Sequence, residues 1–392
     1  MKTMILLLFS CVSVHGQEDS TGVAPSSQEA VYQRPFITRA LGTSIGGYLE
    51  GNSNYFSEDG VTEGLSLELR RFNIFLYSSI APRIKFLAEL EFEHGTEEIA
   101  LETAQVDVEL FRELTLRGGV ILVPLGLFNQ NHDSPKWDIV DRPLVSTMII
   151  PSTFSEVGAG FHGKRPLGSG LSFSYAAFIT NGLSDNVILN AEGRTFLPSG
   201  KGENLFKEDN NGLPAYSGRV AMRHSVGELG VSFYTGVYNS FRVEGETVDE
   251  KRNLTTFAFD LALSYEDFAL RGEAAFNSID VPTNITEIYG NRQWGFFADV
   301  SYRILTGTVW MFPDARLNAV VRGEFIDFNR GTFLFDGSAI LDDITGLTVG
   351  LGFRPAENFV FKANYIRRWT RDAVGTPTVE TAGLQFGFAA YF

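Results

Sequence analysis

Charged side chains stand at every second position along several segments of this 392-residue chain. Between residues 84 and 93, one lysine and three glutamates are interleaved with mostly apolar residues. Residues two apart share one face of a β-strand, so these charges would line one surface of a sheet. Such a surface can attract and orient ions or polar solutes without covalent chemistry. The candidate residues for this surface are Arg71, Lys85, Glu89, Glu91, Arg117, Arg271, Glu273, Arg303, Arg322, Glu324, Arg354 and Lys362.

Motifs that would indicate catalysis or cofactor binding do not fit their surroundings. Residues 158–163 match a dinucleotide-binding fingerprint, but the strand pattern runs on into Arg165-Pro166, where that fingerprint needs a helix. The histidines lack the spacing of a metal-binding helix, and residues 208–212 lack the closing glutamate of a calcium loop. The sequence therefore predicts no metal, no cofactor and no enzymatic activity.

The elements that must position the charges are strands. From residue 43 to the end of the chain, apolar and polar residues alternate with period two, as in Leu384, Phe386 and Phe388 against Gln385 and Gly387. The 40 glycines also argue against a helical protein. Sixteen strand segments are predicted, at about 44–56, 63–79, 83–95, 99–111, 113–123, 155–165, 169–182, 215–225, 229–240, 253–265, 268–278, 291–305, 315–328, 344–354, 357–369 and 380–392.

Connections between these segments alternate between short turns and long loops, with exceptions at 96–98 and 306–314. An even strand number with turns at one end and loops at the other is typical of outer-membrane barrels. Strands of a soluble sandwich would be about 5 or 6 residues long, whereas these are long enough to cross a bilayer at a tilt. The predicted fold is all-β, a transmembrane antiparallel β-barrel over residues 44–392.

Composition and the first residues agree with an exported membrane protein. The formal charge of −15 argues against a nucleic-acid binder, and the mean hydropathy near zero excludes a helical transporter. Lys2, the apolar run 4–14 and the exit at Val14-His15-Gly16 predict a signal peptide over residues 1–16. Residues 17–43 form a polar N-terminal arm that is too short to fill a barrel of this width.

One long connection, over residues 124–154, is predicted to be functional, because loops of this length without secondary structure usually are. Its apolar side chains, among them Trp137 and Ile149, favour packing inside the barrel, where the loop would narrow the lumen. The alternative is an external cap on a neighbouring loop. The candidate constriction residues are His132, Asp133, Lys136, Asp138, Asp141 and Arg142.

Residues 65–165 carry a family resemblance. Arg70-Arg71 with the following segment 84–93, residues 116–126, and Asp141-Arg142-Pro143-Leu144 resemble the phosphate-selective porin O and P family. The resemblance implies a sixteen-stranded trimeric porin with an inward-folded third loop and some anion preference. Phosphate-specific members of the family carry a lumenal arginine ladder and several loop lysines. Here Lys136 and Arg142 stand against three aspartates of the loop, which favours general diffusion over phosphate specificity.

These features together predict an outer-membrane porin of a Gram-negative bacterium. It would allow passive diffusion of small hydrophilic solutes or ions, with selectivity set by pore width and wall charges. Its expected partners are these solutes, the membrane lipid and two further copies in a homotrimer, and no nucleic acid. Two alternatives remain: a barrel that displays loops to a partner and conducts little, and a hydrolase embedded in the barrel wall, since catalytic triads are recognised by geometry.

Overall fold

The computed structural model describes Gln28, Arg34 and residues 38–40, 42–95, 97–202, 206–373 and 375–392. The predicted signal peptide, residues 1–16, lies outside the described residues. Most of the predicted polar arm, residues 17–43, lies outside them as well.

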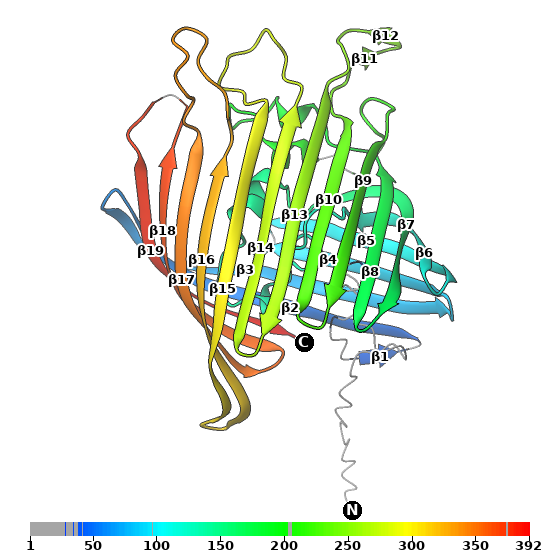
Figure 1. Ribbon diagram of the computed structural model, residues 1–392, viewed down its shortest axis with the longest axis vertical. Helices are drawn as coiled ribbons and strands as arrows, with labels where there is room; N and C mark the ends of the chain where they lie inside the picture. The colour runs from blue at the N-terminus through cyan, green and yellow to red at the C-terminus, as the bar shows by residue number, and fades with distance from the viewer. Residues whose placement is uncertain are drawn as a thin grey trace, which may run out of the picture.

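Sixteen antiparallel strands form a closed barrel, because the last strand pairs with the first long one (Figure 1). This closure leaves no unpaired edge in the wall, which is what a spanning sheet requires. The strands are β2 (Thr43–Glu58), β3 (Val61–Ala81), β4 (Ile84–Glu93), β5 (Glu98–Phe111), β6 (Leu114–Leu122), β7 (Ser155–Gly168), β8 (Leu171–Thr180), β9 (Ala215–His224), β10 (Gly227–Val237), β13 (Asn253–Tyr265), β14 (Phe268–Ile279), β15 (Arg292–Val309), β16 (Phe312–Asp327), β17 (Asp343–Ala356), β18 (Phe359–Arg371) and β19 (Val379–Tyr391). The predicted fold class is confirmed.

Three short strands were not predicted. β1 (Thr38–Ala40) pairs with Thr43–Ile45 of β2, at the end of β2 that β19 does not reach. β11 (Arg242–Val243) and β12 (Glu246–Thr247) form a small hairpin within the loop after β10. None of the three is long enough to give an alternation signal.

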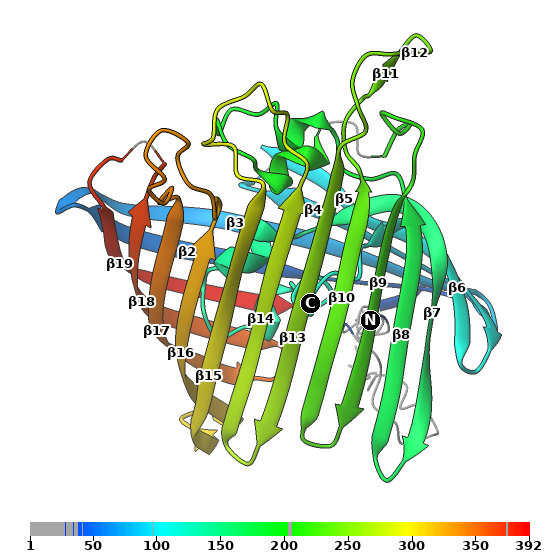
Figure 2. The ribbon, with the colours of Figure 1, turned by 45° about the horizontal axis from the view of Figure 1, so that its top comes forward.

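Short turns lie at one end of the barrel and long loops at the other (Figure 2). One connection differs from the prediction. Residues 306–314 are not a long turn, because β15 and β16 continue to Val309 and Phe312 and leave only Trp310 and Met311 between them. Two register shifts in this pair interrupt the period-two pattern, which explains why the sequence did not reveal the extension. The hairpin projects beyond the other turns, at the bottom of Figure 1.

The two faces of the wall differ in polarity, as β13 shows. Phe257 and Phe259 are 52% and 50% exposed on the outside, whereas Thr256 and Asp260 on the inside are 0% and 5% exposed. An apolar outer band with polar residues inside is the arrangement that a bilayer requires. Aromatic residues also occur on the inner face: Tyr48 of β2 is buried inside, against Phe75 and Tyr391.

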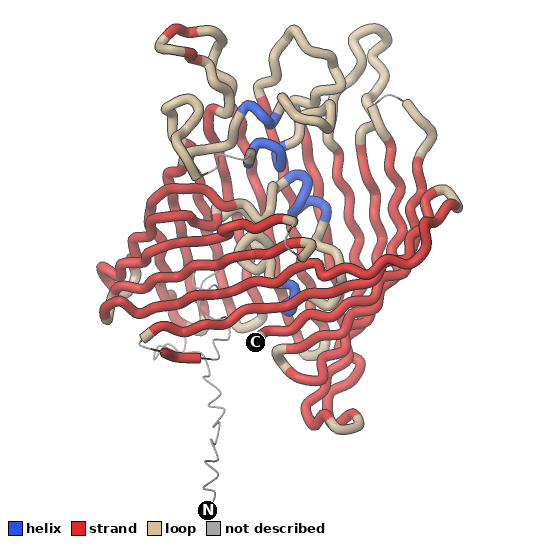
Figure 3. The backbone as a smooth tube through the Cα atoms, turned by 180° about the vertical axis from the view of Figure 1, so that it is seen from behind, coloured by secondary structure: helices blue, strands red, loops and turns tan. Residues whose placement is uncertain are grey.

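Apart from Gln28, the helical segments among the described residues are short and lie in two long loops. These are η2 (Ser134–Lys136) and η3 (Val145–Ile149) in the loop 124–154, and η4 (Asp185–Val187) and η5 (Leu197–Lys201) in the loop after β8. In Figure 3 these segments, in blue, lie between the walls of strands; η2 contacts β2 and β19, and η3 contacts β14, β15 and β16. Among the described residues, no helix has the length and apolar character needed to cross a bilayer.

Candidate functional site: the loop across the lumen

The loop 124–154 lies inside the barrel, as predicted, and Glu273 of β14 binds both the first and the second half of the loop. The Glu273 carboxylate accepts hydrogen bonds from the backbone N–H of Leu127 (2.8 Å) and Phe128 (3.0 Å), and from the Ser146 hydroxyl (2.8 Å). Gly126 makes this approach possible. Its φ is +69°, and a Cβ there would lie 2.3 Å from Glu273 Oε2, so no other residue fits.

Asp138 fixes the middle of the loop to β16 and β17. Arg354 donates to its carboxylate from Nε (2.9 Å) and approaches it again at 2.7 Å, while the Asn318 amide donates at 2.8 Å. Charge-assisted bonds from a planar guanidinium are the stronger and more directional kind of hydrogen bond. The contact therefore fixes the position of this part of the loop along the barrel axis.

Asp141 attaches the next turn of the loop to three further strands. Its carboxylate accepts from Arg70 (3.0 Å), Arg368 (3.1 Å) and Gln385 (3.1 Å), while Arg322 donates to its backbone carbonyl (2.8 Å). Burial alone would raise the pKa of Asp141, but Arg70 and Arg368 lower it below the usual carboxyl value. The loop is thus bound to β3, β18 and β19 by an ionised carboxylate, and to β16 by the backbone carbonyl of the same residue.

Beside β4, Asp133 binds Arg34, a residue of the N-terminal arm. The Arg34 guanidinium donates to both Asp133 oxygens (2.9 and 2.6 Å) and to Glu89 of β4 (2.6 Å). The neighbouring His132 ring bonds Glu102 of β5 (3.1 Å). All these side chains are buried, so the loop, the arm and the wall form one continuous polar contact.

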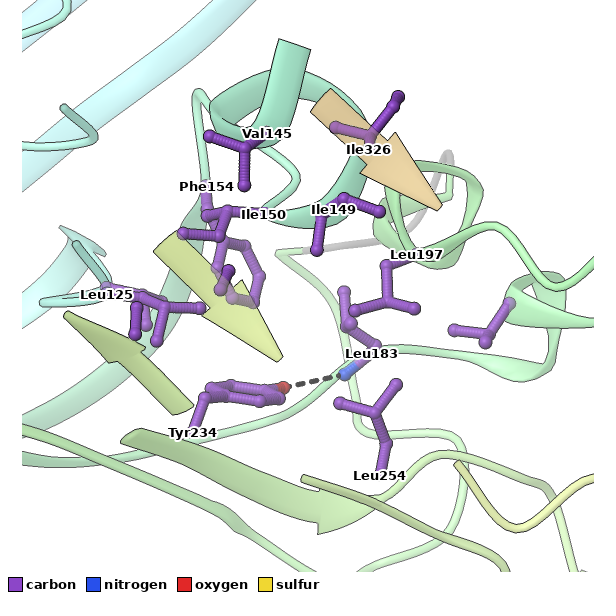
Figure 4. Close-up of a cluster of buried hydrophobic side chains, with 14 of the residues drawn as sticks. Leu125, Val145, Ile149, Ile150, Phe154, Leu183, Leu197, Tyr234, Leu254 and Ile326 are labelled. Atoms are coloured by element: carbon purple, nitrogen blue, oxygen red, sulfur yellow. Dashed lines mark hydrogen bonds between the residues drawn. The ribbon is translucent and has the colours of Figure 1, made fainter. Parts of the chain in front are cut away.

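An apolar cluster forms where the loop meets the loop end of the barrel (Figure 4). Ile149, Ile150 and Phe154 of the loop pack against Leu183 and Leu197 of the connection after β8, and against inward residues of several strands. The Tyr234 hydroxyl accepts from the Leu183 N–H (3.1 Å) and donates to Glu156 (2.9 Å). Part of the lumen is therefore filled by a hydrophobic core that the sequence analysis did not anticipate.

Most of the predicted inward residues touch the loop or each other rather than an open space. Arg117 pairs with Asp107, and Arg71 pairs with Glu91. Residues that bind the loop or the arm directly are Glu89, Arg117, Arg271, Glu273, Arg322, Glu324, Arg354 and Lys362. Their role in lining a water path therefore stays a prediction.

Exposure inside the barrel increases toward the short turns. Arg271 is exposed and lies over the Trp137 ring at 5.1 Å. Lys85 and Arg354 are half-buried, and Arg303, which pairs with Asp267 near a turn, is exposed. The accessible part of the inner surface is therefore predominantly basic at this end.

The remaining predicted loop residues make weaker contacts. Lys136 lies 3.3 Å from Asp133, and its backbone carbonyl accepts from Arg271 (3.1 Å). Arg142 donates to the Thr153 hydroxyl at 3.4 Å. Neither residue reaches as many partners as the three aspartates do.

Several residues of the site escaped the period-two pattern because of bulges. Arg70 is the extra residue where Glu50 pairs with Arg71 and Gly51 with Leu69. Glu102 is the extra residue where Glu89 pairs with Thr103 and Leu90 with Leu101. A bulge turns an extra side chain to the face that the alternation assigns to its neighbours. The phase break at Arg70-Arg71 is visible in the sequence, whereas the one at Glu102 is not.

Glu89, His132 and Asp133 are the one group of acidic and histidine side chains, among the described residues, with the mutual spacing of metal ligands. Their ligand atoms lie within 4.8 Å of one another. However, the Arg34 guanidinium bonds both carboxylates, so the positive charge that they need is supplied by the chain itself. Nothing in this arrangement calls for a metal ion.

The charges around Asp133 predict how its attachment to Arg34 depends on pH. Burial would raise its pKa, but Arg34 above all, with Lys136 and His132, holds it well below the usual carboxyl range. A lowered pKa means that the ionised form stabilises the folded loop at neutral pH, and that this contribution is lost only as pH falls through the lowered value.

We therefore expect Asp133 to stay bound at a pH of about 4.5, close to where an ordinary carboxylate begins to protonate. The ratio of the channel conductance of the natural protein to that of Asp133→Asn should stay constant from about pH 7 to about pH 4.5. Planar-bilayer recordings at stepped pH measure this ratio. Convergence of the two proteins within this interval would show that Asp133 titrates normally.

Comparisons with known proteins agree at the level of fold. No family model matches the chain. An uncharacterised protein of Aquifex aeolicus is 26% identical over 358 residues, which are 84% of this chain and 77% of that protein. The anion-selective porin from Comamonas acidovorans superimposes with a TM-score of 0.57 at 11% identity, over 89% of this chain and 99% of that one. The trimer form of OmpT, an outer membrane protein of Vibrio cholerae, gives 0.52 at 11% identity, over 89% and 99%.

These similarities confirm the resemblance to porins as one of fold. None of them supports the phosphate-selective family in particular. The chain has the fold of the outer-membrane porins, with the loop 124–154 bound across the lumen.

Proposed function

We propose that the protein is a channel of the Gram-negative outer membrane through which small hydrophilic solutes or ions diffuse passively. The observation that carries this proposal is the loop 124–154, bound across a barrel whose inner face is charged and whose outer face is apolar. A loop held by Glu273, Asp138 and Asp141 narrows the lumen at a fixed place. Width and charge at that place then decide what passes.

The proposed channel prefers anions weakly. At the short-turn end, Arg271 is exposed and Arg354 is half-buried, whereas the inward carboxylates Glu273 and Asp299 are buried. Accessible basic groups raise the local concentration of anions, while buried ion pairs contribute little field to the water. The similarity to an anion-selective porin is consistent with this preference but, at 11% identity, does not establish it.

The same proposal includes export through the signal peptide at residues 1–16 and assembly into homotrimers. The trimer form of the Vibrio cholerae protein supports the second point as an analogy of fold. Chemical cross-linking of the protein in detergent measures the oligomer directly. A single monomeric species in mild detergent would contradict the trimer.

A second function is favoured by one specific observation, the apolar cluster in the lumen. A barrel filled in this way would serve as a rigid scaffold that displays its loops and conducts little. The chemistry of a hydrolase finds no comparable support among the described residues.

Single-channel recording separates the two candidates. Purified, refolded protein in a planar bilayer with KCl should give discrete open-channel steps, and a salt gradient should give a small reversal potential of anionic sign. The control is a sample of the same preparation that has been denatured before it is added to the bilayer. A folded barrel without conductance steps would overturn the channel and favour the display function.

A further inference from the structure

The Arg34 guanidinium occupies a closely fitted position between the loop and the wall. It contacts both oxygens of Asp133 (2.9 and 2.6 Å) and one oxygen of Glu89 (2.6 Å). Its central carbon lies 4.2 Å from the centre of the Phe75 ring. A guanidinium group prefers carboxylates at its N–H edge and an aromatic ring on its face, and Arg34 has both kinds of contact.

Other wall residues orient these carboxylates independently of Arg34. The Tyr391 hydroxyl donates to Asp133 Oδ2 (2.7 Å), and the Asn73 amide donates to Glu89 Oε1 (2.8 Å). These donors come from β19 and β3, and both are neutral. The carboxylate pair is therefore positioned by the barrel, and it would keep its shape if the guanidinium left.

Without the guanidinium, the carboxylates of Asp133 and Glu89 would be buried without their counter-charge, which would cost free energy. This cost makes the pair a binding site. Both carboxylates are fully buried, and among the described residues Arg34 is the cation paired with Glu89. Lys136 reaches Asp133 at 3.3 Å, and His132 lies 3.9 Å from it. A buried carboxylate without a counter-charge is unfavourable, and it is neutralised by taking up a proton or a cation.

We propose that Asp133, Glu89 and Phe75 form a guanidinium-binding site in the channel, and that Arg34 is its built-in occupant. Arg34 belongs to the N-terminal arm, which is attached a second time where Arg117 donates to the side-chain and backbone oxygens of Gln28 (2.9 and 3.1 Å). With Arg34 bound, its guanidinium fills the space between Asp133 and Glu89. Soluble guanidinium compounds compete for the same site. The effect on conductance rests on the proposed channel function, whereas the site itself does not.

The first experiment removes the occupant and replaces it. Arg34→Ala should raise single-channel conductance by about twofold, because the passage beside Asp133 opens. Guanidinium chloride should then restore the lower conductance, with an apparent dissociation constant on the order of 1 mM. Tetramethylammonium chloride, which cannot donate hydrogen bonds, should not. Arg112→Ala removes an exposed arginine at the turn after β5 and should behave as the natural protein.

A second variant tests the site from the other side. Arg34→Ala combined with Asp133→Asn should conduct like Arg34→Ala alone but lose the response to guanidinium. Guanidinium that closes both variants equally, or neither, would overturn the proposal.

Calorimetric titration of detergent-solubilised Arg34→Ala with guanidinium chloride separates failure of the site from failure of the channel. Binding without any conductance in any variant would retain the site and contradict the channel. Conductance in every variant without binding would contradict the site and retain the channel.

Discussion

Replacing Asp138 and Asp141 together with asparagine is expected to raise single-channel conductance about threefold and to shift the reversal potential toward anions. The two aspartates bind Arg354, Arg70 and Arg368, which belong to strands on one side of the lumen. Asparagine keeps the size of each side chain but removes its charge. The loop then loses its ionic attachment to this wall.

The selectivity change follows from the charges that remain. Two negative charges disappear, and the three arginines on the wall lose their carboxylate partners on the loop, although Arg354 still donates to the Pro135 carbonyl and Arg70 still pairs with Glu68. Guanidinium groups with fewer carboxylates beside them at a constriction attract anions and repel cations. The side chains of these ion pairs are only 12–24% exposed, so their loss lowers stability, and conductance is compared on protein shown to be folded.

The matched control is Asp267→Asn. Asp267 pairs with Arg303 at 3.5 Å near a turn, where both side chains are exposed and distant from the loop in the register of β14 and β15. This variant changes the formal charge in the same direction and should leave conductance and selectivity close to those of the natural protein. Equal conductance in Asp138→Asn/Asp141→Asn and in the natural protein would contradict the loop as the constriction.

The wall of the barrel could be predicted from the sequence because each strand has one wet and one apolar face. In β13 and β19 that difference appears at every second residue, and the predicted and observed bounds agree within about two residues. The inward direction of residues such as Glu273 and Arg322 follows from the same pattern. The loop 124–154 was predicted to fold inward because its apolar side chains need a covered position.

The partners inside the lumen could not be predicted in the same way. Arg34 lies 99 residues from Asp133 in the chain, and nothing in the polar arm distinguishes it from Arg39. Glu102 reaches His132 only through a bulge, and a single extra residue leaves the surrounding alternation nearly unchanged. Leu183 and Leu197 carry a faint signal, because apolar residues in an otherwise polar loop have to be covered by something. Contacts between the loops and the wall depend on tertiary packing. The alternation pattern and the composition do not tell which loop residue will meet which wall residue.

Replacing Glu273 with alanine is expected to release the loop and to destabilise the barrel by on the order of 3 kcal/mol. Glu273 accepts from two backbone N–H groups and one hydroxyl of the loop, and its own side chain is buried. Alanine leaves the N–H groups of Leu127 and Phe128 without their acceptor. Each buried donor without a partner costs about 1–3 kcal/mol, and the loop can recover that energy only by moving toward water.

Two measurements follow this release. Trypsin should cut the loop after Lys136 in Glu273→Ala, whereas the natural protein should resist, because Trp137 beside this site is buried. Urea unfolding in phospholipid vesicles, followed by tryptophan fluorescence, gives the loss of stability.

Glu109→Ala serves as the control, because it removes an inward glutamate of β5 near the short turns. It should change neither cleavage nor stability. If Glu273→Ala proved as stable and as resistant to trypsin as this control, the loop would be held by its apolar cluster and its three aspartates without Glu273. The carboxylate would then be an ordinary part of the wall rather than the anchor of the constriction.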